Sequence, residues 1–257
     1  MRLTETRRFS EALGSWMHFE ACCFRAGLFS ESSFKSAIGS VASSLHANHK
    51  AARVHADYPL KSIQRVPDAE RAIGGGRKRS VDFAIIYDDR REPPSDPEFL
   101  IEAKWAGSSH CSVANVMADF IRLCVMKRSH PNATCLFVLA GHAKDVDKVL
   151  SRRPFIGGKK DVVRCIGGGT ISKFKFLPKN LEHLKAFAPA ISGFHDANLR
   201  VPIAFSTSGS LPYPAAPAKF KAVAWEVHSV DTQNLSDDEW PKARKKSESA
   251  LSENAIV

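Results

Sequence analysis

The chain has 257 residues, of which 44% are hydrophobic, and this is enough to bury the core of one large domain. Its formal net charge of +10 and its isoelectric point near 9.4 favour a polyanionic partner such as nucleic acid. No apolar run approaches the ~18 residues of a membrane-spanning helix, the N-terminus lacks the apolar stretch of a secretory signal, and the cysteines form no C-x-x-C pair. We therefore expect a cytoplasmic protein without membrane segments, zinc site or disulfide framework.

Residues 8–49 carry apolar side chains three and four positions apart, which is the spacing of amphipathic helices. A break near Gly27 predicts two helices. Ser30 and Ser33 indicate that the second helix begins near Glu31, with this carboxylate in its first turn.

Three strands are expected next, at residues 53–60, 81–87 and 99–105, and the last two are strongly apolar. The segment between them is rich in Asp, Arg and Pro, which predicts an antiparallel hairpin with a long loop. Residues 112–127 have helical spacing and residues 134–140 form an apolar run typical of a buried strand. This order predicts an α/β fold with a mixed sheet.

The last third of the chain is less regular. Residues 181–187 indicate a helix, residues 201–205 and 223–230 indicate two strands, and the sequence becomes polar after Asp231. We expect a single domain over residues 1–230, made of a core at about 29–142 and an extension at 143–230, followed by a disordered tail at 231–257.

Charged residues interrupt two of the apolar strands. Side chains alternate between the faces of a strand, so Glu102 and Lys104 share one face. Asp82 is the lone charge in the preceding strand, and hairpin pairing can bring it close to Glu102. Two carboxylates on a buried sheet need a counter-charge, which a hard divalent cation supplies. A salt bridge from Glu102 to Lys104 or to an arginine is the structural alternative.

The segments Val81-Asp82-Phe83 and Leu100-Ile101-Glu102-Ala103-Lys104-Trp105 together resemble the PD-(D/E)xK superfamily of restriction-endonuclease-like nucleases. The resemblance covers residues 31–140, and Val81 stands where that family usually has proline. It implies a restriction-endonuclease-like αβββαβ core with a mixed central sheet, here carrying a C-terminal extension. It also implies hydrolysis of DNA with Mg²⁺ or Mn²⁺, held by Asp82, Glu102 and the Ala103 carbonyl, with Lys104 as the catalytic lysine.

Further residues are candidates for the same site. Many members of the superfamily use a glutamate from the first core helix, and Glu31 is preferred here over Glu20. Asp119 and Arg122 are three residues apart on the predicted helix, which indicates an intrahelical pair that borders the site. Basic residues could contact phosphates, although a solvated surface is their ordinary role: Arg77, Lys78, Arg79, Lys173 and Lys175.

The leading hypothesis is a Mg²⁺-dependent DNA endonuclease of restriction or phage-defence type, with homodimerisation left open. The alternative is a nucleic-acid-binding module that has the same fold and no catalytic activity. The glycine-rich segments at 74–78 and 167–170 do not match G-x-x-x-x-G-K-[ST], so a P-loop is not indicated.

Overall fold

The computed structural model describes residues 4–46, 51–63, 80–87, 96–155, 171–176, 191, 194, 200–215 and 217–235. The helices within these ranges are α1 (Glu5–Cys22), α2 (Glu31–Leu45), α3 (Val113–Ser129) and α4 (Ala143–Leu150), with short 3₁₀ helices η1 (Ala26–Leu28) and η2 (Lys61–Ile63). The strands are β1 (Ala52–Pro59), β2 (Ser80–Tyr87), β3 (Phe99–Trp105), β4 (Thr134–His142), β5 (Ser172–Lys175), β6 (Ala204–Gly209) and β7 (Phe220–Val230).

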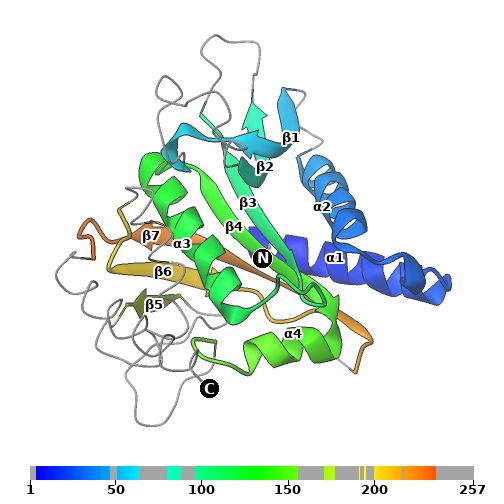
Figure 1. Ribbon diagram of the computed structural model, residues 1–257. Coiled ribbons are helices and arrows are strands. Elements are labelled where there is room, and N and C mark those ends of the chain that lie inside the picture. The colour runs from blue at the N-terminus through cyan, green and yellow to red at the C-terminus, as the bar shows by residue number, and fades with distance from the viewer. Residues whose placement is uncertain are drawn as a thin grey trace, which may run out of the picture.

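The described strands form one seven-stranded sheet in the order β1-β2-β3-β4-β7-β6-β5 (Figure 1). The pair β3 and β4 is parallel, and every other neighbouring pair is antiparallel. The fold is therefore α/β with a mixed sheet. Strands β5 to β7, which come from the C-terminal extension, extend the same sheet as β1 to β4.

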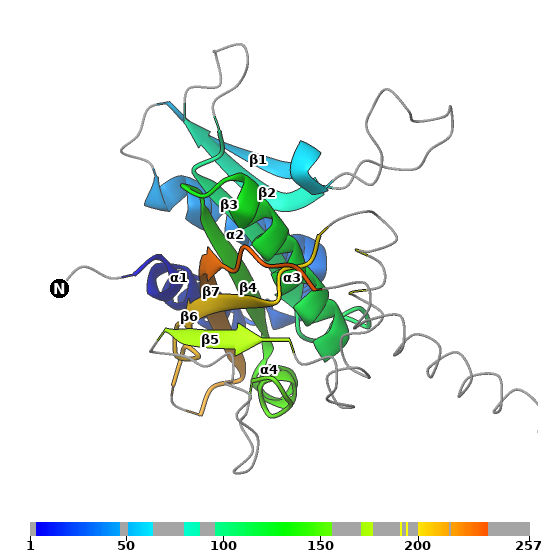
Figure 2. The same ribbon diagram turned by 90° about the vertical axis from the view of Figure 1, so that its left-hand side faces the viewer.

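Helices cover both faces of this sheet (Figures 1 and 2). Phe34 of α2 and Phe9 of α1 pack in one apolar cluster with Ile101 and Trp105 of β3. Phe120 of α3 packs on the opposite face in a second cluster, which also contains side chains of α4. The alternation along β3 follows from this arrangement, because its odd-numbered residues face α1 and α2 and its even-numbered residues face α3.

Helix α1 packs against β7, although the two elements lie at opposite ends of the described chain. Their contact is close at Gly14, where a Cβ atom would lie 2.6 Å from the carbonyl oxygen of Tyr213, in the segment that precedes β7. The absence of a side chain at Gly14 therefore permits the observed distance between helix and segment.

Most elements of the first two thirds agree with the sequence expectations, including the antiparallel pairing of β2 with β3. The strand expected at 201–205 begins only at Ala204, because Val201 and Pro202 pair with residues of the chain beyond β7. Strand β5 and helix α4 were not expected. The helix expected at 181–187 lies outside the described residues.

The first residues of the expected tail pack against the domain. The Leu235 amide donates to the Val201 carbonyl at 2.9 Å, and the Leu235 side chain is buried. Arg128 of α3 donates to the Asn234 side chain. Residues 231–235 therefore belong to the folded body, and residues 236–257 lie outside the described ranges.

Candidate functional site

The residues of the predicted motif meet next to the paired stretch of β2 and β3, where side chains of α2 and α3 contact them. Backbone pairing of the two strands covers Phe83–Ile85 and Phe99–Ile101. Next to the paired stretch, Oδ2 of Asp82 accepts a hydrogen bond from the Ala103 amide at 2.9 Å. A side chain thus takes the place of a strand partner, and this contact holds Asp82 against the strand that carries Glu102.

Helix α3 supplies the partners of Glu102 and Lys104. Arg122 donates to Glu102 Oε1 at 2.9 Å and also lies 3.2 Å from Asp119 Oδ1. Lys104 Nζ lies 3.1 Å from the buried Asp119 Oδ2, as an ion pair without a well-aligned hydrogen bond. The intrahelical pair expected from the spacing of Asp119 and Arg122 is present, and both residues belong to the site.

Asp82 has a cationic partner from the opposite side of the sheet. Lys35 of α2 donates to Asp82 Oδ1 at 2.5 Å. Lys35 was not among the predicted site residues, although its position four residues after Glu31 places both on one face of α2. Together these side chains form what we call the charged cluster: Lys35, Asp82, Glu102, Lys104, Asp119 and Arg122.

Burial sets the protonation behaviour of the cluster. Glu102 is 1% exposed and Asp119 is 2% exposed. Burial raises the pKa of Glu102 well above its ordinary value, and the nearby Arg122 guanidinium offsets only part of this effect. Burial likewise raises the pKa of Asp119 against the opposing effects of Arg122 and Lys104. The cluster therefore holds two carboxyl groups whose charge is incompletely compensated.

The pKa of Lys104 is shifted in the direction that keeps this side chain charged. Burial alone lowers the pKa of Lys104, but the carboxylates of Asp119, Asp82 and Glu102 act in the opposite direction, and the net pKa is raised. Lys104 is consequently an ammonium ion at neutral pH. It can donate hydrogen bonds and positive charge, but it is poorly suited to accept a proton.

Of the two glutamates considered for the first helix, Glu31 lies closer to the motif. It occupies the first turn of α2, after the capping box formed by Ser30 and Ser33, and its Oε2 accepts from the Ser108 hydroxyl at 3.2 Å. Ser108 follows β3, so Glu31 lies beside the end of the strand that carries Glu102. Glu20 instead pairs with Arg25 at the end of α1.

Of the predicted phosphate-binding residues, the two that the structure describes, Lys173 and Lys175, do not lie at the cluster. Arg77, Lys78 and Arg79 lie outside the described residues. Lys173 and Lys175 are exposed on β5, at the edge of the sheet, and β4, β7 and β6 separate them from β3. Any nucleic acid that contacts both β5 and the charged cluster would have to cross this width of the sheet.

The chemistry of the donors can be compared with the needs of a metal ion. Asp82 and Glu102 offer hard carboxylate oxygens of the kind that Mg²⁺ prefers. Within the described ranges, no three His, Cys, Asp or Glu side chains are arranged as a metal-binding group. In the observed arrangement Lys35 and Arg122 form ion pairs with the two carboxylates that the motif assigns to a metal.

Comparisons with known protein families found no family that matches this chain. Searches among curated proteins and among solved structures likewise found no match. None of the helices in the described part of the chain is long and apolar enough to cross a membrane.

Proposed function

We propose that the protein is a metal-dependent nuclease that hydrolyses phosphodiester bonds of DNA, with a core of the restriction-endonuclease-like type. The observation that carries the proposal is the convergence of Asp82, Glu102 and Lys104 at the separation of β2 and β3. The element order α2-β1-β2-β3-α3-β4 supports the αβββαβ core, and the net charge of +10 supports a polyanionic substrate.

The donor set fits Mg²⁺ or Mn²⁺ at Asp82, Glu102 and the Ala103 carbonyl. The fit rests on the buried Glu102 carboxyl, because its raised pKa means that Arg122 alone does not compensate the buried charge. When bound, such an ion supplies a Lewis acid for the scissile phosphate and lowers the pKa of a coordinated water. Lys35 and Arg122 contact Asp82 Oδ1 and Glu102 Oε1, so the ion would compete with these two cations for the carboxylates.

Lys104 acts in this proposal as a donor. Since its pKa is raised, its ammonium group orients the attacking water or a phosphate oxygen and stabilises negative charge that develops on the phosphate. A group other than Lys104 then takes the proton from the water. Arg122, which contacts Glu102 and Asp119 at once, holds the two carboxylates in place and is a positioning residue.

One observation favours a second candidate, a nucleic-acid-binding module without turnover. Each carboxylate of the charged cluster already has a cationic partner at 3.2 Å or less. The cluster can therefore be a set of structural ion pairs that needs no metal. The two candidates differ in what they require of divalent metal, and this difference decides between them.

The test combines cleavage with metal-dependent stability. Purified protein is incubated with supercoiled, linear, single-stranded and branched DNA, and with RNA, in Mg²⁺, Mn²⁺ or EDTA. The nuclease proposal expects cleavage in metal only, a loss of at least about 100-fold in Lys104→Ala and Glu102→Gln, and retained DNA binding in both variants. Glu20→Gln is the matched control and should cleave as the wild type does, because Glu20 of α1 pairs with Arg25 just after the end of that helix.

Thermal melting provides the second readout. Mg²⁺ should raise the melting temperature of the wild type by mass action and should raise that of Glu102→Gln less. DNA binding without cleavage of any substrate, together with equal melting in Mg²⁺ and EDTA, would favour the non-catalytic module. Cleavage by Lys104→Ala at the wild-type rate would refute the assignment of the motif.

A further inference from the structure

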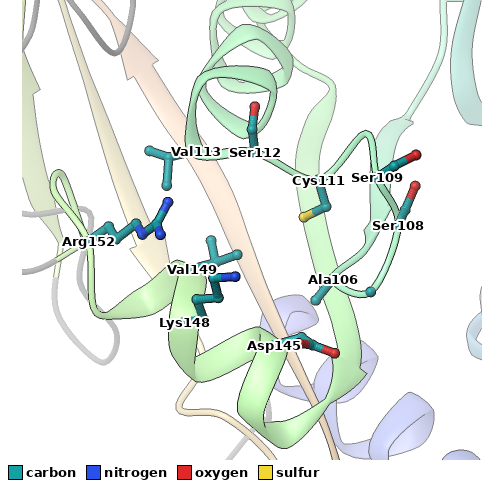
Figure 3. A pocket seen from close by; sticks show the side chains of 11 residues that line it. Ala106, Ser108, Ser109, Cys111, Ser112, Val113, Asp145, Lys148, Val149 and Arg152 are labelled. Atoms are coloured by element: carbon teal, nitrogen blue, oxygen red, sulfur yellow. The ribbon is translucent and has the colours of Figure 1, made fainter.

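A cavity of about 420 Å³ lies between the loop that follows β3 and helix α4 (Figure 3). Its volume is within the range of pockets that bind small ligands or parts of larger ones. Ser108, Cys111 and Ser112 line it from the loop, and Lys148 and Arg152 line it from α4 and the turn that follows. Figure 3 shows the two basic side chains on one side of this space and Cys111 on the other.

Among the residues that the structure describes, the two basic residues have no acidic partner. Within the described residues, neither Lys148 nor Arg152 makes an ion pair with a carboxylate, and both are exposed to solvent. Among the described residues that line the cavity Asp145 is the one acidic residue, so Lys148, Arg152 and Asp145 together give the lining a formal charge of +1. Cationic side chains beside serine hydroxyls are donors for a phosphate group.

The N-terminus of α3 also contributes donors to the cavity. Ser112 is the N-cap of α3, a helix of 17 residues, and its hydroxyl accepts from the Asn115 amide. The N-terminal end of a helix presents backbone amides and a partial positive charge, which favour an anion. Donors from the loop, the start of α3 and α4 thus surround one space.

The cavity lies next to the charged cluster. Ala106 lines the cavity and lies two residues after Lys104 in the chain, and Ser108 lines it and donates to Glu31 beside the end of β3. Cys111 lines it as well, and its thiol interacts electrostatically with Lys104 and Asp119 of the cluster. A nucleic-acid strand bound at the cluster can therefore reach the cavity with a neighbouring phosphate or with its own end.

We propose that this cavity binds a phosphate group of the nucleic acid whose backbone is cleaved at the charged cluster. This inference rests on the proposed function for the nature of the ligand. The phosphate is either an internal diester next to the cleaved bond or a monoester at the end of the strand. Lys148 and Arg152 supply the charge, and the Ser112 hydroxyl, which accepts from the Asn115 amide, supplies a neutral donor with its own proton.

The experiment measures binding in EDTA, so it does not depend on catalysis. Fluorescence anisotropy compares labelled single-stranded oligonucleotides with a 5′-phosphate, a 3′-phosphate or neither, and unlabelled circular single-stranded DNA serves as a competitor without ends. The variants are Lys148→Gln, Arg152→Gln and the double variant. Lys144→Gln, an exposed lysine of α4 that does not line the cavity, is the matched control.

We expect the double variant to bind at least about tenfold more weakly, with a log K against log[salt] slope that is smaller by about one or two. A loss restricted to one phosphorylated end identifies a terminal monoester as the ligand. An equal loss for all oligonucleotides and for circular DNA identifies an internal diester. Lys144→Gln should bind as the wild type does, and melting curves check that every variant is folded.

Alkylation of Cys111 gives a readout inside the cavity. The oligonucleotide that binds best should slow modification of Cys111 in the wild type and should protect it less in the double variant at the same concentration. The proposal is overturned if the double variant binds every oligonucleotide as Lys144→Gln does, or if the wild type binds none. If the wild type cleaves no substrate but the double variant binds DNA more weakly, the phosphate-binding role of the cavity is supported and the proposed nuclease activity is refuted.

Discussion

Phe24 has a backbone conformation that proteins usually reserve for glycine. It follows the end of α1 with a φ of 60°, and its side chain is 98% exposed. The Arg25 amide donates to the Glu20 carbonyl and the Phe24 amide to that of Ala21, which is the Schellman motif that ends a helix. The ring contributes little to the core, while its Cβ atom makes this backbone conformation unfavourable.

Replacing Phe24 with glycine should therefore stabilise the fold. We expect Phe24→Gly to raise the free energy of unfolding by up to about 1 kcal/mol, because glycine adopts positive φ without a steric penalty. Phe24→Ala removes the ring but keeps the Cβ atom, so it should remain close to the wild type. Urea denaturation of the three proteins measures the difference, and equal midpoints for the Gly and Ala variants would contradict the explanation.

Cys111 should be a slow thiol despite its position in the cavity. Burial raises its pKa to about 11, against the opposing effect of Lys104. The thiol is the protonated form at neutral pH, and the reactive thiolate becomes more abundant as the pH rises toward 11. Alkylation of Cys111 should accordingly accelerate by about tenfold per pH unit between pH 7 and 10. Peptide mass spectrometry at each pH measures the rate, and a rate that levels off near pH 8 would contradict the raised pKa.

Individual residues of the site differed in how well the sequence predicted them. Asp82, Glu102 and Lys104 stood out because charges interrupt apolar strands, and strand alternation correctly placed Glu102 and Lys104 on one face. Lys35 could not be found in this way, since its contact with Asp82 depends on how α2 packs against the sheet. The sequence suggested an uncompensated repulsion at Asp82, whereas the cations of α2 and α3 compensate much of it.

At the level of elements, the packing of α1 on the segment before β7 depends on Gly14. Alanine usually stabilises a helix relative to glycine, but here the new Cβ atom would meet the Tyr213 backbone at 2.6 Å. We expect Gly14→Ala to lower the free energy of unfolding by roughly 1–3 kcal/mol through overpacking. Gly27→Ala is the control, because a Cβ atom added at Gly27 would meet no other atom within 4 Å.

Chemical denaturation of both alanine variants tests this prediction. Gly27→Ala should be as stable as the wild type or slightly more stable, since alanine restricts the unfolded chain. A Gly14→Ala protein at least as stable as Gly27→Ala would mean that α1 can move away from Tyr213 at no cost.

Long segments with a regular hydrophobic pattern predicted helices and strands well, and short segments did not. Strands β2, β3 and β4 and helix α3 are buried and have clear hydrophobic patterns, so their positions followed from the sequence. Helix α4 has eight residues and β5 has four, which is too short for a periodic pattern to be distinctive. The order of the strands in the sheet could not be predicted from the sequence either. Strand β7 pairs with β4, and most of the C-terminal extension lies between these two segments in the chain.

For the whole molecule, the end of the folded body can be tested by truncation. A chain that ends at Val230 loses the buried Leu235 side chain and the contact between Asn234 and Arg128. Burial of a leucine contributes about 1.5–3 kcal/mol, so this truncation should lower the melting temperature by at least about 3 °C. A chain that ends at Leu235 retains these contacts and should melt close to the full chain. Equal melting of the two truncated chains would mean that residues 231–235 contribute nothing to stability.

The packing of α1 against β7 has a consequence for the synthesis of the protein on the ribosome. Phe9, Leu13 and Met17 form the apolar face of α1, and their cluster includes Phe220, Ala222 and Ala224 of β7. A ribosome adds about 5–20 residues per second, so α1 waits for roughly ten seconds or more before β7 has been synthesised. Throughout this interval part of its apolar face lacks its final partner and is available to chaperones or to other nascent chains. The N-terminal helix is thus an early aggregation hazard during translation, and completion of β7 removes it.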